Sequence, residues 1–265
     1  MPLQIFHRID GFCVFFCQRQ PLFIPCQIVS QPHAARKETG APVINRYIGD
    51  TTICIDGSWI QNFTGFLDNM MNLELLFEAT AFSGDSTFYN IAVKHADTTM
   101  AHHFRPDNSC YHVVDYDPET GEVRKRQTAQ GYADESSWAR GQAWALYGYT
   151  ACYRYTKDKK YLDQAQKVYN FIFTNKNLPE DLVPYWDYDA PNIPNEPRDA
   201  SAAACTASAL YELDGYLPGN HYKETADKIH SVGSIPHGQE IDVPLNYADY
   251  YFLEGLMRKR DLEKK

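Results

Sequence analysis

Apolar and polar residues follow a pattern that occurs three times along this chain. Each time, a segment that is apolar on nearly every side is followed by a short polar turn and then by a segment with one polar face. A helix that is apolar all round is buried, whereas a helix with one polar face lies at the surface. The three predicted pairs are Asp68–Ala81 with Thr87–His102, Arg140–Thr156 with Lys160–Asn175, and Asp199–Tyr216 with His221–Ile229.

The second helix of each pair carries the same signature near its start. An aromatic residue is followed four positions later by alanine, as in Phe88 and Ala92, Tyr161 and Ala165, and Tyr222 and Ala226. A fourth helix of the buried type is expected at Leu245–Arg258. Repeated helix pairs of this length form stacked architectures. We therefore predict an all-α fold, an α/α toroid of inner and outer helices; the alternative is a generic helical bundle.

Two long polar segments, Phe104–Ser137 and Leu178–Arg198, connect the predicted pairs. Loops this long inside a compact domain are usually functional. Because both leave the same ends of their helices, they are expected to line one mouth of the ring. Within the first, Tyr111–Arg126 has alternating flanks around a DPETG turn, which predicts a hairpin.

Two regions depart from the repeat. Residues 1–53 show no clear helical period, and we interpret them as a divergent N-terminal segment, a remnant of early helix pairs. The α/α-toroid domain is then expected over residues 54–265. The third outer helix is predicted to end near Ile229–His230 after about two turns, whereas its predecessors run for about four.

Size and charge exclude several classes of function. The chain has 265 residues, of which 44% are hydrophobic, enough to bury a large core. The net charge is −9 and no basic patch is visible, so we expect no nucleic-acid partner. No apolar run is long enough to span a membrane, and the N-terminus makes a poor signal peptide. We expect a cytoplasmic protein without a membrane partner; a periplasmic location is the alternative.

The residues that usually hold metals and cofactors lack the required spacing. The seven cysteines are irregularly spaced and form no Cys-x-x-Cys pair, which favours reduced thiols over a disulfide framework or zinc site. The acidic residues do not have the spacing of an EF-hand loop, and no glycine-rich phosphate loop occurs. We predict no metal and no organic cofactor.

The stretch Gln130–Trp144 concentrates chemically useful side chains just before an apolar helix. It reads QGYADESSWARGQAW and holds two carboxylates, one guanidinium, two amides and two indoles. Loops that enter helices present polar groups on a rigid scaffold. Indole faces beside planar hydrogen-bond donors suit a sugar that carries a carboxylate. The alternative is a polar helix start whose tryptophans pack in the core.

Several long motifs occur in the order found in one enzyme family. They are LDNMMNLELL at 67–76, YHVVDYDPETG at 111–121, QGYADESSWARGQAW at 130–144, VPYWDYDAPNIPNEPRDASAAA at 183–204 and HSVGSIPHGQEIDVPLNYADYYFLEGL at 230–256. Over roughly residues 54–265, the chain resembles the unsaturated glucuronyl hydrolases of glycoside hydrolase family 88. The resemblance implies an (α/α)6 barrel, of which this chain is expected to form an incomplete version.

The resemblance also implies a reaction and a partner. The substrate would be an unsaturated uronic-acid oligosaccharide left by a polysaccharide lyase, with a 4,5-unsaturated sugar at its non-reducing end. A carboxylic acid protonates C4, positive charge develops at C5 and the ring oxygen, and water adds at C5. The hemiketal that results opens and releases the remaining sugar. This differs from direct attack by a pair of carboxylates on the glycosidic bond.

Asp68 is the residue that the resemblance assigns as general acid and base. It lies at the start of an almost wholly apolar helix, between Phe66-Leu67 and Met70-Met71. Apolar surroundings raise the pKa of a carboxyl group, whereas a helix N-terminus favours its anion. The alternative is that Asp68 serves as the helix N-cap.

Other site residues are carried over from the family in the same way. Arg140 and Trp144 match substrate-contacting positions four residues apart on one helix face. A guanidinium can hold a carboxylate, and an indole can stack on a sugar ring. The remaining matched positions are His112, Thr128, Gln130, Ser231 and Ser234. The serine pair helps to hold a sulfate in members that carry lysine two residues later; here that residue is Pro236, so a strong preference for sulfated substrates is not expected.

Four further aspartates in the matched motifs are expected to be structural. We interpret them as helix caps, turn residues, or partners of Arg140 and Arg198, with Asp199 as the N-cap of its helix. The four are Asp134, Asp187, Asp189 and Asp199.

The chain departs from the family near its N-terminus. The family has a second essential aspartate in a His-Asp-x-Gly-Phe motif, and the nearest text here is HRIDGF, which offers Asp10 in a displaced position. Family members are also longer, so we expect a truncated or altered version of a family gene. Two other functions stay open: a catalytically inactive sugar-binding remnant, and an unsaturated rhamnogalacturonyl hydrolase.

Overall fold

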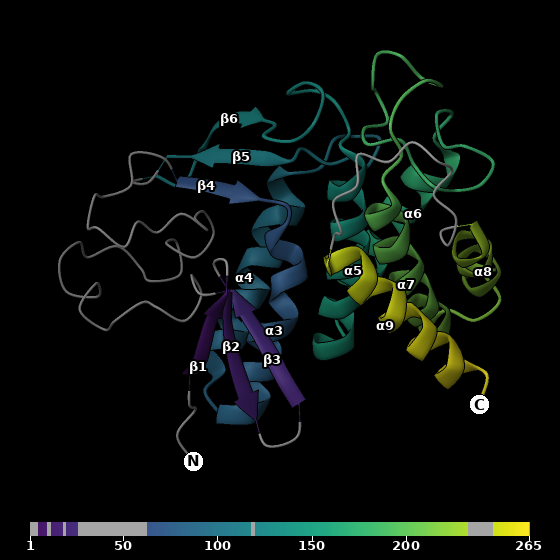
Figure 1. The fold of residues 1–265 in the computed structure, drawn as a ribbon. Coiled ribbons are helices and arrows are strands. Elements are labelled where there is room, and N and C mark those ends of the chain that lie inside the picture. Colours follow the sequence, from purple (N-terminus) through teal and green to yellow (C-terminus); the bar gives the residue numbers. More distant parts are fainter. Residues whose placement is uncertain are drawn as a thin grey trace.

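The computed structural model describes residues 5–9, 12–17, 20–25, 63–117, 120–232 and 246–264. Its larger part is helical (Figure 1), and each predicted helix is present with its ends displaced by a few residues at most. The helices are α3 (Asn69–Ser83), α4 (Ser86–His102), α5 (Ala139–Thr156), α6 (Lys159–Thr174), α7 (Ala200–Tyr216), α8 (Tyr222–Val232) and α9 (Asn246–Leu262). In the described part of the chain, no helix combines the length and apolar character needed to cross a bilayer.

The helices alternate between inner and outer positions, as the polarity pattern predicts. Inner helix α5 packs between α3 and α7, and α7 packs between α5 and α9. Outer helices α4, α6 and α8 pack on α3, α5 and α7 respectively. The fold is therefore an arc of an α/α toroid, and the prediction of fold class is confirmed. Helix α8 has 11 residues against 17 in α4 and 16 in α6, so the third outer helix is the shortest, as expected.

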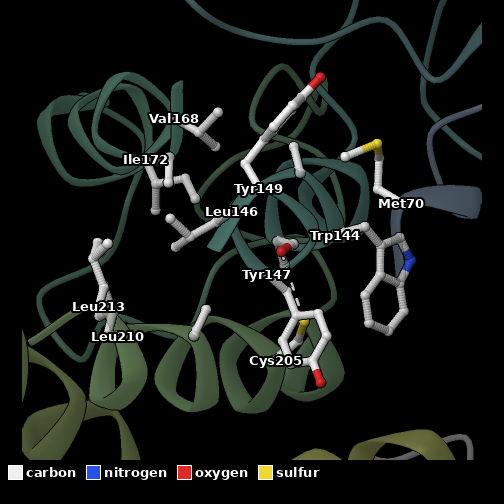
Figure 2. Packing of buried hydrophobic residues seen from close by; sticks show 14 of the residues in the cluster. Met70, Trp144, Leu146, Tyr147, Tyr149, Val168, Ile172, Cys205, Leu210 and Leu213 are labelled. Atoms are coloured by element: carbon white, nitrogen blue, oxygen red, sulfur yellow. Dashed lines mark hydrogen bonds between the residues drawn. The ribbon is translucent and has the colours of Figure 1, made fainter. Parts of the chain in front are cut away.

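Small residues explain how closely the inner helices approach. An added Cβ at Gly148 of α5 would lie 2.6 Å from the Met70 Cβ and 2.8 Å from its carbonyl oxygen in α3. Figure 2 shows side chains around α5 on several sides, with Met70 and Trp144 together, Val168 and Ile172 on α6, and Leu210 and Leu213 on α7. Helix α5 is thus enclosed by its neighbours.

The alanine signature of the outer helices has a packing role. Ala92, Ala165 and Ala226 are each fully buried. A methyl side chain at these positions lets the outer helix approach its inner partner closely. The turns SGDST and TKDKK supply the caps of two outer helices, because the carboxylates of Asp85 and Asp158 accept hydrogen bonds from the backbone N–H groups of Thr87 and Lys160.

An ion-pair network joins the inner helices. Arg154 of α5 pairs with Glu74 of α3 and Glu212 of α7, and Arg258 of α9 lies 3.0 Å from Glu212. Burial acts to raise the pKa of Glu212, but the two guanidinium groups outweigh it, and the pKa is lowered. Tyr147 donates to Glu74 at 2.8 Å, which adds a second link between α5 and α3.

The predicted hairpin is present and belongs to a larger sheet. Strands β5 (Val113–Tyr116) and β6 (Val123–Gln127) pair antiparallel, and β4 (Phe63–Phe66) pairs antiparallel with the other edge of β5. The sequence did not predict β4. It also predicted no element where β1 (Ile5–Ile9), β2 (Phe12–Cys17) and β3 (Gln20–Pro25) form an antiparallel sheet in the order β1-β2-β3.

The two long loops meet, as expected. The Ala139 N–H donates to the Trp186 carbonyl at 3.1 Å, and the Tyr188 N–H donates to the Ser137 carbonyl at 3.0 Å. In Figure 1, the β4–β5–β6 sheet and the loop between α6 and α7 lie at the same end of the helices. This end gathers most of the residues that the sequence marks as chemically active.

Candidate functional site

The ladder between β4 and β5 brings Asp68 to His112, 44 residues away in the sequence. Phe66 pairs with Val113, and the next rung is a hydrogen bond of 2.9 Å from the Leu67 N–H to the His112 carbonyl. The chain then enters α3. The imidazole Nε2 of His112 lies 3.1 Å from the Asp68 carboxylate Oδ2.

Asp68 does not cap its helix. It occupies the residue before α3, but its backbone is already helical (φ −53°, ψ −29°) and its side chain makes no capping hydrogen bond. The carboxylate turns to His112 instead, and its side chain is 33% exposed. A carboxyl group that is held on one side and still accessible has the geometry required of a proton donor and acceptor.

His112 is buried and fixed from several sides. Its Nδ1 lies 3.2 Å from the backbone nitrogens of both Ala129 and Gln130, and 3.3 Å from the Thr128 hydroxyl. Its ring lies 4.3 Å from the Trp138 ring, centroid to centroid, at an interplanar angle of 32°. Loop 128–130 therefore contributes backbone donors to the site in addition to side chains.

Trp138 connects His112 to the cationic end of the site. The Arg140 guanidinium carbon lies 4.9 Å from the centroid of the Trp138 ring. Arg140 also lies 3.7 Å from the Asp199 carboxylate and donates to the Ser201 hydroxyl at 3.4 Å. A continuous row of contacts thus connects the Asp68 carboxyl group with the Arg140 guanidinium group. A site that protonates an anionic substrate needs both groups, one to donate the proton and one to hold the anion.

Asp199 has both roles expected of it. Its Oδ1 accepts a hydrogen bond of 2.9 Å from the Ala202 N–H, so it is the N-cap of α7. Its Oδ2 faces Arg140. The structural interpretation of this aspartate is confirmed.

Three further aspartates hold the loop that contacts His112 in place through hydrogen bonds. Asp134 accepts from the Thr128 N–H at 3.0 Å, and Asp189 accepts from the Ser137 N–H at 2.9 Å. The fully buried Asp187 accepts from the Tyr132 N–H at 2.9 Å and from the Ser136 hydroxyl at 2.7 Å. Their structural role was predicted, and the contacts confirm it.

The two indoles of the motif occupy different environments. Trp144 is 3% exposed, belongs to the hydrophobic core and lies 5.2 Å from the Tyr251 ring. Its assignment as a surface that stacks on sugar stays a prediction. Trp138, which was not among the predicted site residues, is the indole in contact with His112 and Arg140. The feature of the sequence that could have identified Trp138 as a site residue was its position two residues before Arg140.

Of the four remaining predicted residues, only Gln130 has a side chain that the structure describes. The Gln130 side chain is exposed, and its contact with His112 is made by its backbone. Ser231 lies in α8, but its side chain is not described. Ser234 and Asp10 lie outside the described residues, so their assignment as site residues stays a prediction.

The sequence matches a known family over most of its length. The profile of Glycosyl Hydrolase Family 88 covers residues 56–232. The chain is 47% identical to an unsaturated glucuronyl hydrolase of Formosa agariphila over 252 residues, which is 85% of this chain and 62% of that protein. It is 35% identical to an unsaturated chondroitin disaccharide hydrolase of Streptococcus agalactiae, over 75% of this chain and 56% of that protein.

Solved structures give the same result for the fold. A crystal structure of an unsaturated glucuronyl hydrolase specific for heparin matches with a TM-score of 0.75 and 41% identity, over 84% of this chain and 66% of that one. A mutant of the Streptococcus agalactiae enzyme, complexed with dGlcA-GalNAc6S, matches with a TM-score of 0.62 and 33% identity, over 74% of this chain and 59% of that one. The chain thus spans about three fifths of the length of these relatives. It is a member of Glycosyl Hydrolase Family 88.

Proposed function

We propose that this chain is a hydrolase that releases a 4,5-unsaturated glucuronic acid from the non-reducing end of an oligosaccharide produced by a polysaccharide lyase. The observation that carries the proposal is the position of Asp68. Its carboxylate is 33% exposed, makes no capping hydrogen bond and lies 3.1 Å from His112. Such a carboxyl group suits proton transfer to a bound substrate better than stabilisation of a helix.

In the proposed mechanism, Asp68 acts first as an acid and then as a base. Its carboxyl proton is transferred to C4, and the electron pair of the double bond forms the new C–H bond. The cation at C5 is stabilised by the ring oxygen. Water then attacks C5 and gives its proton to the Asp68 carboxylate, which restores the acid. The C5 hemiketal opens by breaking the bond between C5 and the ring oxygen, which leaves a ketone at C5 and a hemiacetal at C1. The hemiacetal breaks down to an aldehyde, and the rest of the oligosaccharide leaves as an alcohol.

Arg140 is proposed to hold the uronic-acid carboxylate. The guanidinium group is the natural partner of such an anion. Its contacts with Trp138 and Asp199 fix its direction before substrate arrives. This arrangement reduces the entropy lost on binding.

The relatives support the substrate class. Proteins 47% and 35% identical to this chain are named for unsaturated glucuronyl and unsaturated chondroitin disaccharide substrates. We therefore propose an unsaturated uronic-acid oligosaccharide as the partner, without a nucleic-acid or membrane partner. The location we propose is the cytoplasm, with support from the buried free thiols of Cys110, Cys152 and Cys205.

The test is the loss of the ultraviolet absorbance of the conjugated double bond when the purified chain is mixed with an unsaturated chondroitin or hyaluronan disaccharide. The Asp68→Asn variant is measured beside it, and circular dichroism establishes that both are folded. We expect the absorbance to fall with the wild type and to stay constant with the variant. A folded wild type that leaves the absorbance unchanged would instead identify an inactive, sugar-binding member of the family.

A further inference from the structure

The surroundings of His112 determine which ring nitrogen carries its proton. Nδ1 lies 3.2 Å from the backbone nitrogens of Ala129 and Gln130. A backbone N–H can only donate a hydrogen bond, so Nδ1 has to accept. The Thr128 hydroxyl, at 3.3 Å, can donate to the same atom. A proton on Nδ1 would point at two amide hydrogens.

The proton of the neutral ring is therefore on Nε2, which faces Asp68 Oδ2 at 3.1 Å. Here the imidazole donates and the carboxylate accepts. The packing prevents a ring flip that would exchange the two nitrogens. His112 is 3% exposed, the Trp138 ring lies 4.3 Å from it, and the Phe66 ring meets it edge-on at 5.9 Å.

His103 offers an opposite case in the same protein. Its Nδ1 lies 3.1 Å from the Tyr111 carbonyl oxygen. A carbonyl oxygen can only accept, so the proton of His103 is on Nδ1. Burial lowers the pKa of His103 to about 3, so this ring is neutral. The two histidines are thus fixed as opposite tautomers.

We propose that His112 is a positioning residue that is held as the Nε2–H tautomer. Its Nε2–H group donates a hydrogen bond to Oδ2 of Asp68, which leaves Oδ1 as the oxygen that exchanges its proton with the substrate. Because Nδ1 is already occupied by backbone donors, His112 does not relay protons. The part that concerns proton exchange rests on the proposed function of Asp68. The tautomer does not rest on it and can be measured separately.

The first experiment is nitrogen-15 NMR of the wild-type protein with labelled histidine, at neutral pH and without substrate. The two-bond couplings to the ring protons separate the tautomers. We expect His112 to show an unprotonated Nδ1 and a protonated Nε2, and His103 to show the reverse. The His112 signals are assigned by their absence in a His112→Gln variant. A protonated Nδ1 on His112, in either the neutral or the cationic ring, would overturn the proposal.

The second experiment compares two variants that differ in the length of the side chain at position 112. The amide nitrogen of glutamine in His112→Gln occupies nearly the place of Nε2, so the donor to Asp68 is retained. The shorter asparagine in His112→Asn reproduces only the Nδ1 side. We expect His112→Gln to keep kcat within about tenfold of the wild type and His112→Asn to lose about a hundredfold, with KM little changed in both.

Circular dichroism and thermal melting of both variants establish that they are folded. Equal losses of kcat in the two folded variants would contradict the role of the Nε2 donor. If the wild type is inactive but its NMR spectrum shows the expected tautomer, the proposed function is wrong and the tautomer assignment of His112 is still supported.

Discussion

Gly131 lies in a tightly packed part of the loop that contacts His112. An added Cβ would lie 2.6 Å from the Thr128 hydroxyl oxygen, 3.0 Å from Asp187 Oδ2 and 3.1 Å from the Ser136 hydroxyl oxygen. The Gly131 N–H also donates to the Thr128 hydroxyl at 2.7 Å. The residue next to Gln130 is therefore small because three polar side chains occupy the space around it.

For Gly131→Ala we predict a loss of about 1–3 kcal/mol in the free energy of unfolding, as in other overpacked sites. Activity should fall as well, because the Thr128 hydroxyl has to move away from His112. Urea unfolding and the absorbance assay measure the two effects. A Thr128→Ala/Gly131→Ala double variant removes the obstructing hydroxyl and should regain part of the stability. Wild-type stability in Gly131→Ala would contradict this account.

Two substitutions of Asp199 can separate the contributions of its two contacts to stability. Asparagine retains an oxygen that accepts from the Ala202 N–H but lacks the charge that faces Arg140. We predict that Asp199→Ala costs about 1–2 kcal/mol of unfolding free energy and that Asp199→Asn costs clearly less. Urea unfolding of both variants provides the measurement, and equal losses would show that the cap contributes little.

Among elements, α3 and α5 approach each other closely where they cross. Gly148 meets the Met70 backbone there, and Asp68 lies two residues before Met70. The ion pairs of Arg154 with Glu74 and Glu212 fix the same inner helices further along. The position of α3 against α5 therefore also sets the position of the proposed acid.

We predict that Gly148→Ala destabilises the fold by about 1–3 kcal/mol, because the Met70 backbone cannot yield without a shift of α3. Activity should fall in the same variant. Gly215→Ala in α7 is the matched control, since its Cβ would meet only the Leu262 side chain at 3.7 Å. There we expect up to about 1 kcal/mol of added stability from helix propensity. Thermal melting measures both; equal melting temperatures would contradict the close crossing.

The sequence predicted the elements that depend on a local pattern and missed those that depend on contacts between distant segments. Each inner and outer helix was visible because its polarity repeats within one segment. Strand β4 has four residues and no repeat, so it was missed. The family resemblance placed Asp68 and His112 in one site, but the contact between them depends on that strand and was not predicted. Residue type alone could not distinguish Trp138 from Trp144, because an indole suits a core as well as a site; only the resemblance selected Trp144.

At the scale of the whole molecule, Asp227 of α8 joins three helices at the end of the arc. It accepts from Lys223 in its own helix at 2.9 Å, from Tyr211 of α7 at 2.8 Å, and lies 2.7 Å from Lys259 of α9. Burial acts to raise the pKa of Asp227, but hydrogen bonds from Lys259 and Lys223 outweigh it and lower the pKa to about 2.

This shift predicts a pH dependence of stability. The carboxyl pKa falls from 3.8 to about 2 on folding, so the stabilisation is complete above about pH 5 and is lost as the pH falls through about 4 to 2. Since the group is partly exposed, solvent screening reduces the contribution to about 1 kcal/mol. Urea unfolding of the wild type and of Asp227→Asn should differ at about pH 6 and converge near pH 2. A difference that persists in acid would contradict the assignment.

The rung from the Leu67 N–H to the His112 carbonyl has a practical consequence. This amide can exchange its hydrogen with solvent only while the rung is open, and the rung is part of the backbone that holds Asp68 beside His112. When the rung closes faster than the open amide exchanges, its exchange rate divided by that of an unstructured amide gives the fraction of molecules in which the rung is open. A variant far from the mouth that lowers activity can be examined in this way without any substrate.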